Sequence, residues 1–377
     1  MGLLMNKVPG LCTNFCMTKK VIRVSAVVIA IVVLLGFMLS MSPKMKIRAF
    51  APPTPKVYGA STSAKGMCTL DLETGRVFYE HNADTQLPMA STTKVATAIT
   101  AIEAFEEQGR SLDEKLKIND KAVGIEGTSI YLKKGEELTA RELLLGIMLR
   151  SGNDASSAIA LATKPTIAEF AALMNKLAER VGATASNFKN PHGLDEEGHH
   201  TTARDLAKIA AYAMKNPTFA GIVKTVQAKI DGAEYPRILH NKNRLLKSLD
   251  GCVGVKTGFT KKAGRCYVAA REANGSTTIC VVLNCGPMFE EAETLMTSAV
   301  EQFPIRQLIT VDTFIPLRDE GVSQSDGVGE SAAIAIEDFF YPLSDAELEV
   351  IKITLDGEEV VVTLNDKEIY RAECNVL

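Results

Sequence analysis

The sequence lacks the charge excess, the repeated apolar runs and the compositional bias that mark several classes of protein. Its 377 residues carry a net charge of only −3, which argues against a nucleic-acid binder, because phosphate partners require a basic face. With 46% hydrophobic and 23% charged residues, it is neither a disordered nor a collagen-like chain. A single long uncharged stretch excludes a polytopic membrane protein. What remains is a globular chain long enough for two domains.

A zinc-type C-x-x-C pair is also absent among the cysteines that follow the leader. Six of the eight cysteines follow residue 51, at spacings too irregular for a disulfide framework. Cys280, for example, lies in an apolar run where a thiol packs as a small hydrophobic group. We therefore expect most of these six to be buried free thiols: Cys68, Cys252, Cys266, Cys280, Cys285 and Cys374.

Charge is unevenly distributed along the chain. Residues 1–51 contain seven basic and no acidic side chains, whereas residues 304–377 contain five basic and sixteen acidic ones. Residues 52–65 are rich in Pro, Ser, Thr and Ala and are typical of a linker. We predict a leader over 1–51, this linker, a main domain over 66–303 and a C-terminal domain over 304–377.

The leader has the pattern of an export signal. Four basic residues precede the uncharged stretch Val24–Met41, whose eighteen residues are at the lower limit for crossing a bilayer. Ala49-Phe50-Ala51 is a candidate cleavage site, although Pro52 directly after it is unfavourable. Two alternatives remain open: a cleaved signal, or an uncleaved membrane anchor through residues 24–41. In either case the rest of the chain is expected to be exported, at the outer face of the cytoplasmic membrane or in the cell-wall space.

Strand patterns stand at both ends of the main domain, with helix patterns between them. We therefore expect an α/β (α+β) domain in which the first and last strands are neighbours in one antiparallel sheet flanked by helices. Residues beyond 304 alternate in a way typical of a small all-β domain, with Asp356-Gly357 as a hairpin turn. Strands are predicted at 67–72, 77–80, 254–256, 266–271, 277–284, 309–315, 350–355, 359–364 and 368–377, and helices at 91–108, 139–149, 166–181, 202–214 and 290–302.

Ser91 and Lys94 form the first motif that carries chemistry. A serine hydroxyl is a poor nucleophile unless a base lies within hydrogen-bond reach, and residues three apart on a helix share a face. A lysine in a partly desolvated pocket loses its proton more easily and can act as that base. A second copy of the S-x-x-K pattern, Ser186 to Lys189, lies in a turn-rich loop, so its two side chains have no helical face to share.

Two further motifs follow the first. Ser151-Gly152-Asn153 lies between helices, where a loop can present a hydroxyl and an amide to a site. Lys256-Thr257-Gly258 ends a strand pattern, so that a cation and a hydroxyl can hold a carboxylate beside a backbone edge open to an extended substrate.

The ordered motifs S-x-x-K, S-x-N and K-T-G resemble those of the penicillin-binding protein and serine β-lactamase superfamily. Matches around Asn190-Pro191-His192-Gly193-Leu194 and Lys256-Thr257-Gly258-Phe259-Thr260 make the chain similar to low-molecular-mass serine D-alanyl-D-alanine carboxypeptidases, the group of penicillin-binding protein 5. The resemblance implies that the terminal D-alanine is removed from peptidoglycan stem peptides and that β-lactams act as covalent inhibitors.

The resemblance also implies a role for each motif residue. Ser91 would be acylated and Lys94 would take its proton. Ser151 would relay protons, and Asn153 would hold the substrate amide. Lys256 and Thr257 would bind the terminal carboxylate beside Gly258. Backbone N–H groups of Ser91 and Phe259 would form the oxyanion hole.

The chain departs from the family pattern in two places. Cys252 stands just upstream of the K-T-G motif, in an unusual run. The C-terminus reads as a strand, whereas the family typically ends in an amphipathic helix on the membrane. Any anchoring would therefore fall to residues 24–41.

Three alternative functions share part of this pattern: a class A β-lactamase, a DD-endopeptidase and a non-catalytic wall-binding protein. A class A β-lactamase needs a further glutamate for deacylation, yet Glu169, the nearest candidate, fits a helix-capping box, and Gly152 replaces the usual aspartate. A DD-endopeptidase would use the same machinery. A non-catalytic wall-binding protein would have lost Ser91 or Lys94, and both are present.

The histidines give no independent site in the sequence. His199-His200 has no third ligand at a metal-binding spacing, so we interpret it as a polar loop before the Thr202 cap. His192 is interpreted as structural. We expect neither a metal nor a cofactor, and we expect the acidic C-terminal domain to position the catalytic domain over the cell wall.

Overall fold

The computed structural model describes residues 62–231, 235–312, 314–316 and 332–376. The predicted export signal, its candidate cleavage site, the 24–41 segment and most of the 52–65 linker lie outside the described residues. Within the described ranges, no helix is both long enough and apolar enough to cross a bilayer.

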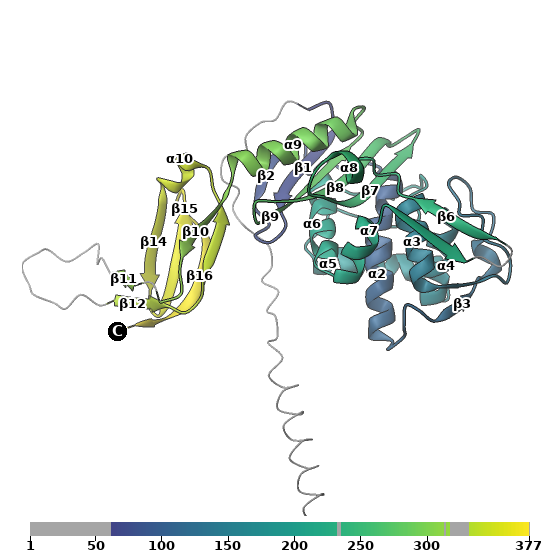
Figure 1. The fold of residues 1–377 in the computed structure, drawn as a ribbon, viewed down its shortest axis with the longest axis horizontal. Helices are drawn as coiled ribbons and strands as arrows, with labels where there is room; N and C mark the ends of the chain where they lie inside the picture. The colour runs from purple at the N-terminus through teal and green to yellow at the C-terminus, as the bar shows by residue number, and fades with distance from the viewer. Residues whose placement is uncertain (1–61, 232–234, 313, 317–331, 377) are drawn as a thin grey trace, which may run out of the picture. The chain divides into compact units, whose positions relative to one another are not determined.

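A five-stranded antiparallel sheet forms the centre of the main domain, in the order β2-β1-β9-β8-β7 (Figure 1). The first strand of the domain pairs with the last one, as predicted, with Met67 opposite Val282. Asn274 and Gly275, both with positive φ, form the expected tight turn between β8 and β9. The strands are β1 (Gly66–Asp71), β2 (Val77–His81), β7 (Cys252–Thr260), β8 (Gly264–Ala273) and β9 (Ser276–Leu283).

Helices cover both faces of this sheet. Helix α9 (Met288–Gln302) packs on one face, and α6 (Ala203–Met214) and α7 (Pro217–Lys224) pack on the other (Figure 1). Successive strand side chains therefore enter different cores, as the alternation of a pleated strand requires. Cys266 belongs to the core on the α6 side and Tyr267 to the core beneath α9.

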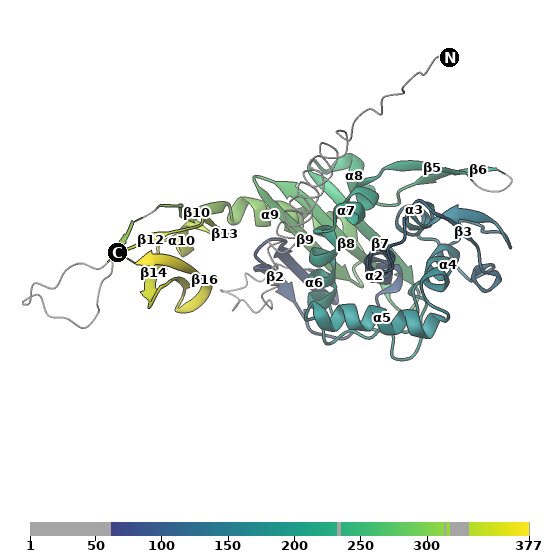
Figure 2. The ribbon, with the colours of Figure 1, turned by 90° about the horizontal axis from the view of Figure 1, so that it is seen from below.

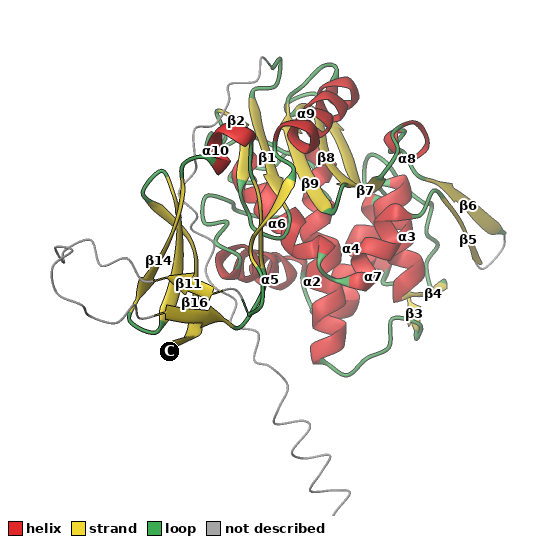
Figure 3. Ribbon diagram, turned by 60° about the vertical axis from the view of Figure 1, so that its left-hand side comes forward, coloured by secondary structure: helices red, strands yellow, loops and turns green. Residues whose placement is uncertain are grey.

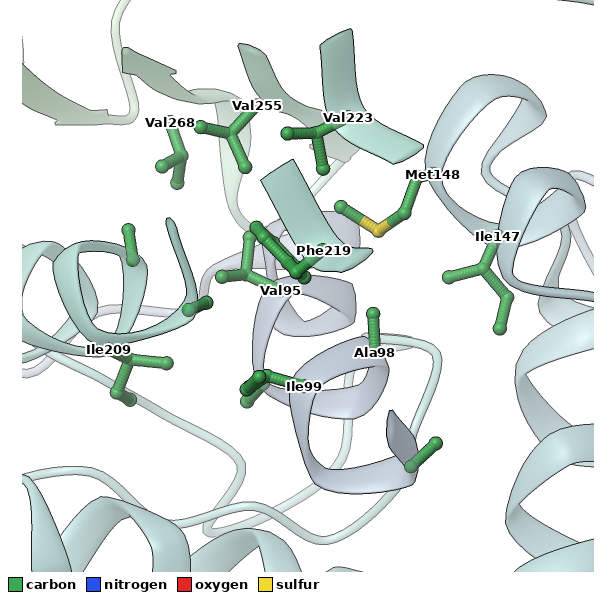
Figure 4. Packing of buried hydrophobic residues seen from close by; sticks show 14 of the residues in the cluster. Val95, Ala98, Ile99, Ile147, Met148, Ile209, Phe219, Val223, Val255 and Val268 are labelled. Carbon is green, nitrogen blue, oxygen red and sulfur yellow. The ribbon is translucent and has the colours of Figure 1, made fainter. Parts of the chain in front are cut away.

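Helix α2 (Lys94–Glu107) is the central helix of the domain and lies among the other helices (Figure 2). Val95 and Ile99, one turn apart, pack with Phe219 of α7 and Val255 of β7 (Figure 4). Because α2 is buried along most of its length, its first turn is held rigidly. The remaining helices around it are α3 (Ala140–Arg150), α4 (Asn153–Thr163) and α5 (Ile167–Arg180).

The predicted helix starts are largely confirmed. Thr139 and Thr166 form complete capping boxes with Glu142 and Glu169, and Thr202 accepts a hydrogen bond from the N–H of Asp205. The start of α2 differs from the expectation: a 3-10 turn, η1 (Ala90–Thr93), precedes the α-helix.

Several short elements were not predicted. Helix α4 begins at Asn153, directly after the Gly152 N-cap, so the S-x-N motif ends inside a helix rather than in a loop. The Ala- and Ser-rich sequence of α4 gives little apolar periodicity. Brief or exposed elements give equally weak patterns: β3 (Lys115–Lys117), η2 (Asp120–Ala122), β4 (Glu137–Thr139), β5 (Gln227–Asp231), β6 (Pro236–His240) and α8 (Leu245–Ser248).

The C-terminal region is almost entirely β-structure, as expected (Figure 3). Its larger sheet has the order β11-β12-β16-β15-β14, and Asp356-Gly357 lies at the predicted hairpin. The single strand expected over 309–315 is instead two, since β10 ends at Ile309 and β11 begins at Phe314. The elements are β10 (Ile305–Ile309), β11 (Phe314–Pro316), β12 (Ala332–Ala335), β13 (Phe339–Pro342), α10 (Asp345–Leu348), β14 (Ile351–Asp356), β15 (Glu359–Leu364) and β16 (Lys367–Val376).

Candidate active site

Ser91 lies in the 3-10 turn η1, and Lys94 is the first residue of α2. In a 3-10 turn residues i and i+3 eclipse one another, so the pattern brings the two side chains together even more directly than an α-helix would. Lys94 Nζ is 2.9 Å from Ser91 Oγ. Ala90, just before Ser91, has a φ of 49°, a left-handed conformation that a non-glycine residue keeps only when its surroundings impose it.

The amine of Lys94 is buried among three oxygen atoms. Besides Ser91 Oγ, it lies 2.7 Å from Asn153 Oδ1 and donates to the backbone carbonyl of His192. Burial, together with the positive charges of Lys256 and Lys242, holds the pKa of Lys94 well below its usual value.

The contacts of Lys94 define the direction of proton transfer. The amide oxygen of Asn153 and the carbonyl of His192 can only accept hydrogen bonds, so they take the two N–H groups of a neutral amine. In that neutral state its lone pair can face Ser91 Oγ, 2.9 Å away, and accept the proton of the hydroxyl. This is the arrangement that a general base requires.

Asn153 is held by the loop that precedes β4. Its Nδ2 donates to the carbonyl of Glu126 at 2.6 Å, and its backbone N–H donates to Thr128 at 2.7 Å. The buried carboxylate of Asp154 accepts hydrogen bonds from the backbone N–H groups of Ile130 and Leu132, both at 3.0 Å. Asn153 is therefore a rigid partner for Lys94. Sequence reasoning overlooked Asp154.

Strand β7 brings the K-T-G motif against the nucleophile turn. It is one of the two edge strands of the sheet. A Cβ added to Gly258 would lie 3.0 Å from the backbone nitrogens of both Ser91 and Thr92, so glycine permits this close approach. Phe259, the next residue, is 65% exposed.

Lys256 lies on the buried side of β7, and its Nζ donates to the carbonyl of Thr257 at 2.7 Å. Burial, reinforced by the charge of Lys242, lowers the pKa of Lys256 to about 7. A bound carboxylate would favour its protonated form. Ser151 is buried at the C-cap of α3, two residues before Asn153.

Residues 190–193 line the site beside Lys94. They contact it through backbone atoms, which the sequence did not predict. The carbonyl of His192 contacts Lys94, and that of Pro191 accepts a hydrogen bond from Thr97 at 2.7 Å. A Cβ on Gly193, where φ is 84°, would lie 2.0 Å from the carbonyl oxygen of Ala90. Glycine is therefore required at this contact.

The second S-x-x-K copy is not a site of this kind. Ser186 Oγ lies 2.7 Å from Thr201 Oγ1 and donates to Asp205 Oδ2 at 3.0 Å, whereas Lys189 is exposed. Glu169 is likewise exposed and bonded to its own cap. The six cysteines after the leader are all buried free thiols.

Comparison with known proteins identifies the family of the chain. A family model described as D-alanyl-D-alanine carboxypeptidase matches residues 51–286. The D-alanyl-D-alanine carboxypeptidase DacF of Bacillus subtilis is 35% identical over 240 residues, which cover 62% of this chain and 62% of that protein. DacC of Escherichia coli is 31% identical over 295 residues, which cover 74% of this chain and 73% of the relative.

Solved structures extend the likeness to the fold. The D-alanyl-D-alanine carboxypeptidase DacD from Francisella tularensis superimposes with a TM-score of 0.73 at 21% identity, covering 88% of this chain and 96% of that one. A variant of the Streptomyces K15 DD-transpeptidase gives a TM-score of 0.59 at 31% identity, covering 63% of this chain and 98% of the other.

Proposed function

The chain belongs to the D-alanyl-D-alanine carboxypeptidase family, and we propose that it is an exported serine hydrolase that removes the terminal D-alanine from peptidoglycan stem peptides. The observation that carries the proposal is the separation of 2.9 Å between Lys94 Nζ and Ser91 Oγ, with the two N–H groups of the amine engaged elsewhere. A serine with a buried, desolvated amine beside it is an activated nucleophile.

The proposed reaction proceeds through an acyl-enzyme on Ser91. Ser91 Oγ attacks the carbonyl carbon of the penultimate D-alanine while its proton passes to Lys94 Nζ. The negative oxygen that forms is stabilised by the backbone N–H groups of Ser91 and Phe259. The C–N bond then breaks, and the departing D-alanine amine takes the proton of Lys94 through Ser151, which leaves Lys94 neutral again. Water hydrolyses the ester and restores the Ser91 hydroxyl.

We assign recognition of the substrate's C-terminal end to strand β7. Lys256 and Thr257 bind the terminal carboxylate, and the free edge of the strand aligns the peptide by backbone hydrogen bonds. A β-lactam would acylate Ser91 in the same way, but its leaving nitrogen stays tethered within the opened ring. We propose that this ester persists, so a fluorescent penicillin reports on the site.

Mass spectrometry of a peptide ending in D-Ala-D-Ala, incubated with the full chain, tests the proposal. We expect a product one D-alanine shorter. The same peptide with an amidated C-terminus should react far more slowly, because it offers no carboxylate to Lys256 and Thr257. Cross-linked muropeptides in a parallel incubation report endopeptidase cleavage. Absence of the shortened product, or equal rates for acid and amide, would contradict the assignment.

A second prediction concerns pH and the lysine next to the site, Lys242. Acylation requires neutral Lys94 and protonated Lys256, so the rate should fall on the acid side as Lys94 protonates and on the alkaline side as Lys256, with its pKa of about 7, loses its proton. The charge of Lys242 lowers the pKa of both lysines.

Substituting Lys242→Gln should therefore raise both pKa values and move both limbs of the pH profile to higher pH. The measurement is the second-order rate of penicillin labelling across the pH range, with Lys242→Arg as the charge-conserving control. If the two limbs of the pH–rate profile stay at the same pH in the Gln variant, or move to lower pH, Lys242 does not act on the site through its charge.

A further inference from the structure

His199 is buried behind the nucleophile turn, in the loop between α5 and α6, with 6% of its surface exposed. Its ring contacts the buried ring of Phe188 edge-on, with 6.0 Å between the centroids. Both ring nitrogens have partners: Nδ1 lies 3.0 Å from the backbone N of Lys189, and Nε2 lies 2.9 Å from Thr93 Oγ1. These contacts leave neither nitrogen open to a metal.

The partners of His199 fix its tautomer. A backbone N–H can only donate, so Nδ1 accepts from Lys189 and the proton of the neutral ring is on Nε2. Nε2–H then donates to Thr93 Oγ1, whose own proton goes to the carbonyl oxygen of Ala90 at 2.8 Å. Burial, with a smaller contribution from the charge of His200, lowers the pKa of His199 to about 4, so the ring is neutral at physiological pH.

The end of this hydrogen-bond chain is the peptide group that precedes the nucleophile. The carbonyl of Ala90 and the N–H of Ser91 belong to one planar trans peptide, so fixing the direction of the carbonyl fixes the opposite direction of the N–H. Ala90 is in the left-handed region, with φ at 49°, and Gly193 packs against the same carbonyl.

We propose that His199 is a positioning residue, which orients the Ser91 N–H in the oxyanion hole through Thr93 and the Ala90 peptide. This inference rests on the proposed function, since it presupposes an acyl-enzyme on Ser91. The N–H interacts with a negative oxygen that exists only in the transition state. A loss of its orientation should therefore slow acylation while leaving the initial binding of the ligand largely unchanged.

Two substitutions separate this role from simple support of the loop. The amide nitrogen of His199→Gln can replace Nε2 and still donate to Thr93. His199→Asn can keep an acceptor for Lys189 but cannot reach Thr93. Fluorescent-penicillin labelling at several concentrations gives the limiting acylation rate and the half-saturating concentration separately. His200→Gln, which alters the neighbouring side chain, is the matched control.

We expect His199→Asn to lower the limiting rate by about 10- to 100-fold with little change in half-saturation, and His199→Gln to stay within about 3-fold of the parent chain. Thr93→Val should cost about as much as His199→Asn, and the double variant should be no slower than either, because both changes break one chain. Equal rates for the Asn and Gln variants, additive losses, or an effect confined to half-saturation would overturn the proposal.

Failure of the proposed function would look different. If neither the parent chain nor His200→Gln is labelled, there is no acyl-enzyme and the assignment of Ser91 itself is wrong. Suppose instead that the parent chain and His200→Gln are both labelled, and that His199→Asn has a folded circular dichroism spectrum and is labelled at the parental rate. Then the assignment of Ser91 stands and only the role of His199 is refuted.

Discussion

Covalent labelling of the chain by a fluorescent penicillin is expected to disappear when Ser91 is replaced by alanine. The hydroxyl at this position is the oxygen that Lys94 can deprotonate and the atom that would become the ester. Among the described residues, no other hydroxyl contacts the amine of Lys94, so the loss should be complete rather than partial. Labelled protein is measured by in-gel fluorescence after incubation with a saturating concentration of the probe.

The chain supplies its own control in the second S-x-x-K copy. Ser186→Ala removes a hydroxyl that bonds Thr201 and Asp205, which should cost about 1 kcal/mol of stability and leave labelling unchanged. If Ser91→Ala and Ser186→Ala label equally well, the nucleophile has been misassigned. The comparison is informative because the two serines share the same sequence pattern and differ in what surrounds them.

The sequence was sufficient to predict this difference because it depends on local structure. A helical pattern follows Ser91, whereas turn residues follow Ser186. The same kind of information predicted the capping boxes at Thr139 and Thr166, and the order of strand and helix patterns along the chain predicted that the first and last strands are neighbours. Helix periodicity and turn residues are properties of consecutive residues, so they can be recognised from the sequence alone.

Long-range contacts to backbone atoms could not be predicted in this way. The carbonyl of His192, which binds Lys94, belongs to a residue interpreted as structural from its side chain. His199 was interpreted as part of a polar loop, because nothing in the residues around it shows that Thr93 lies against its ring. Such contacts depend on how a loop folds over a distant helix, and any residue type supplies a carbonyl.

Replacing Lys94 by alanine is the second change with a large expected effect. Penicillin acylation should slow by on the order of 10³-fold, because Lys94 is the one base found against Ser91 Oγ in the part of the chain that the structure describes, and a positioned proton acceptor contributes about 10²- to 10⁴-fold. The measurement is the labelling rate with a long incubation, together with far-ultraviolet circular dichroism to confirm that the chain is folded.

The matched control is Lys189→Ala, which removes the exposed lysine of the second copy and should leave the rate unchanged. The two amines differ in environment rather than in type: burial and neighbouring cations hold the pKa of Lys94 well below its usual value. Raising the pH of the Lys94→Ala reaction should recover only a small part of the rate, since hydroxide from solvent is not held at Ser91. A variant that regains the parental rate at high pH, or that loses none at neutral pH, would show that the buried amine is not the base.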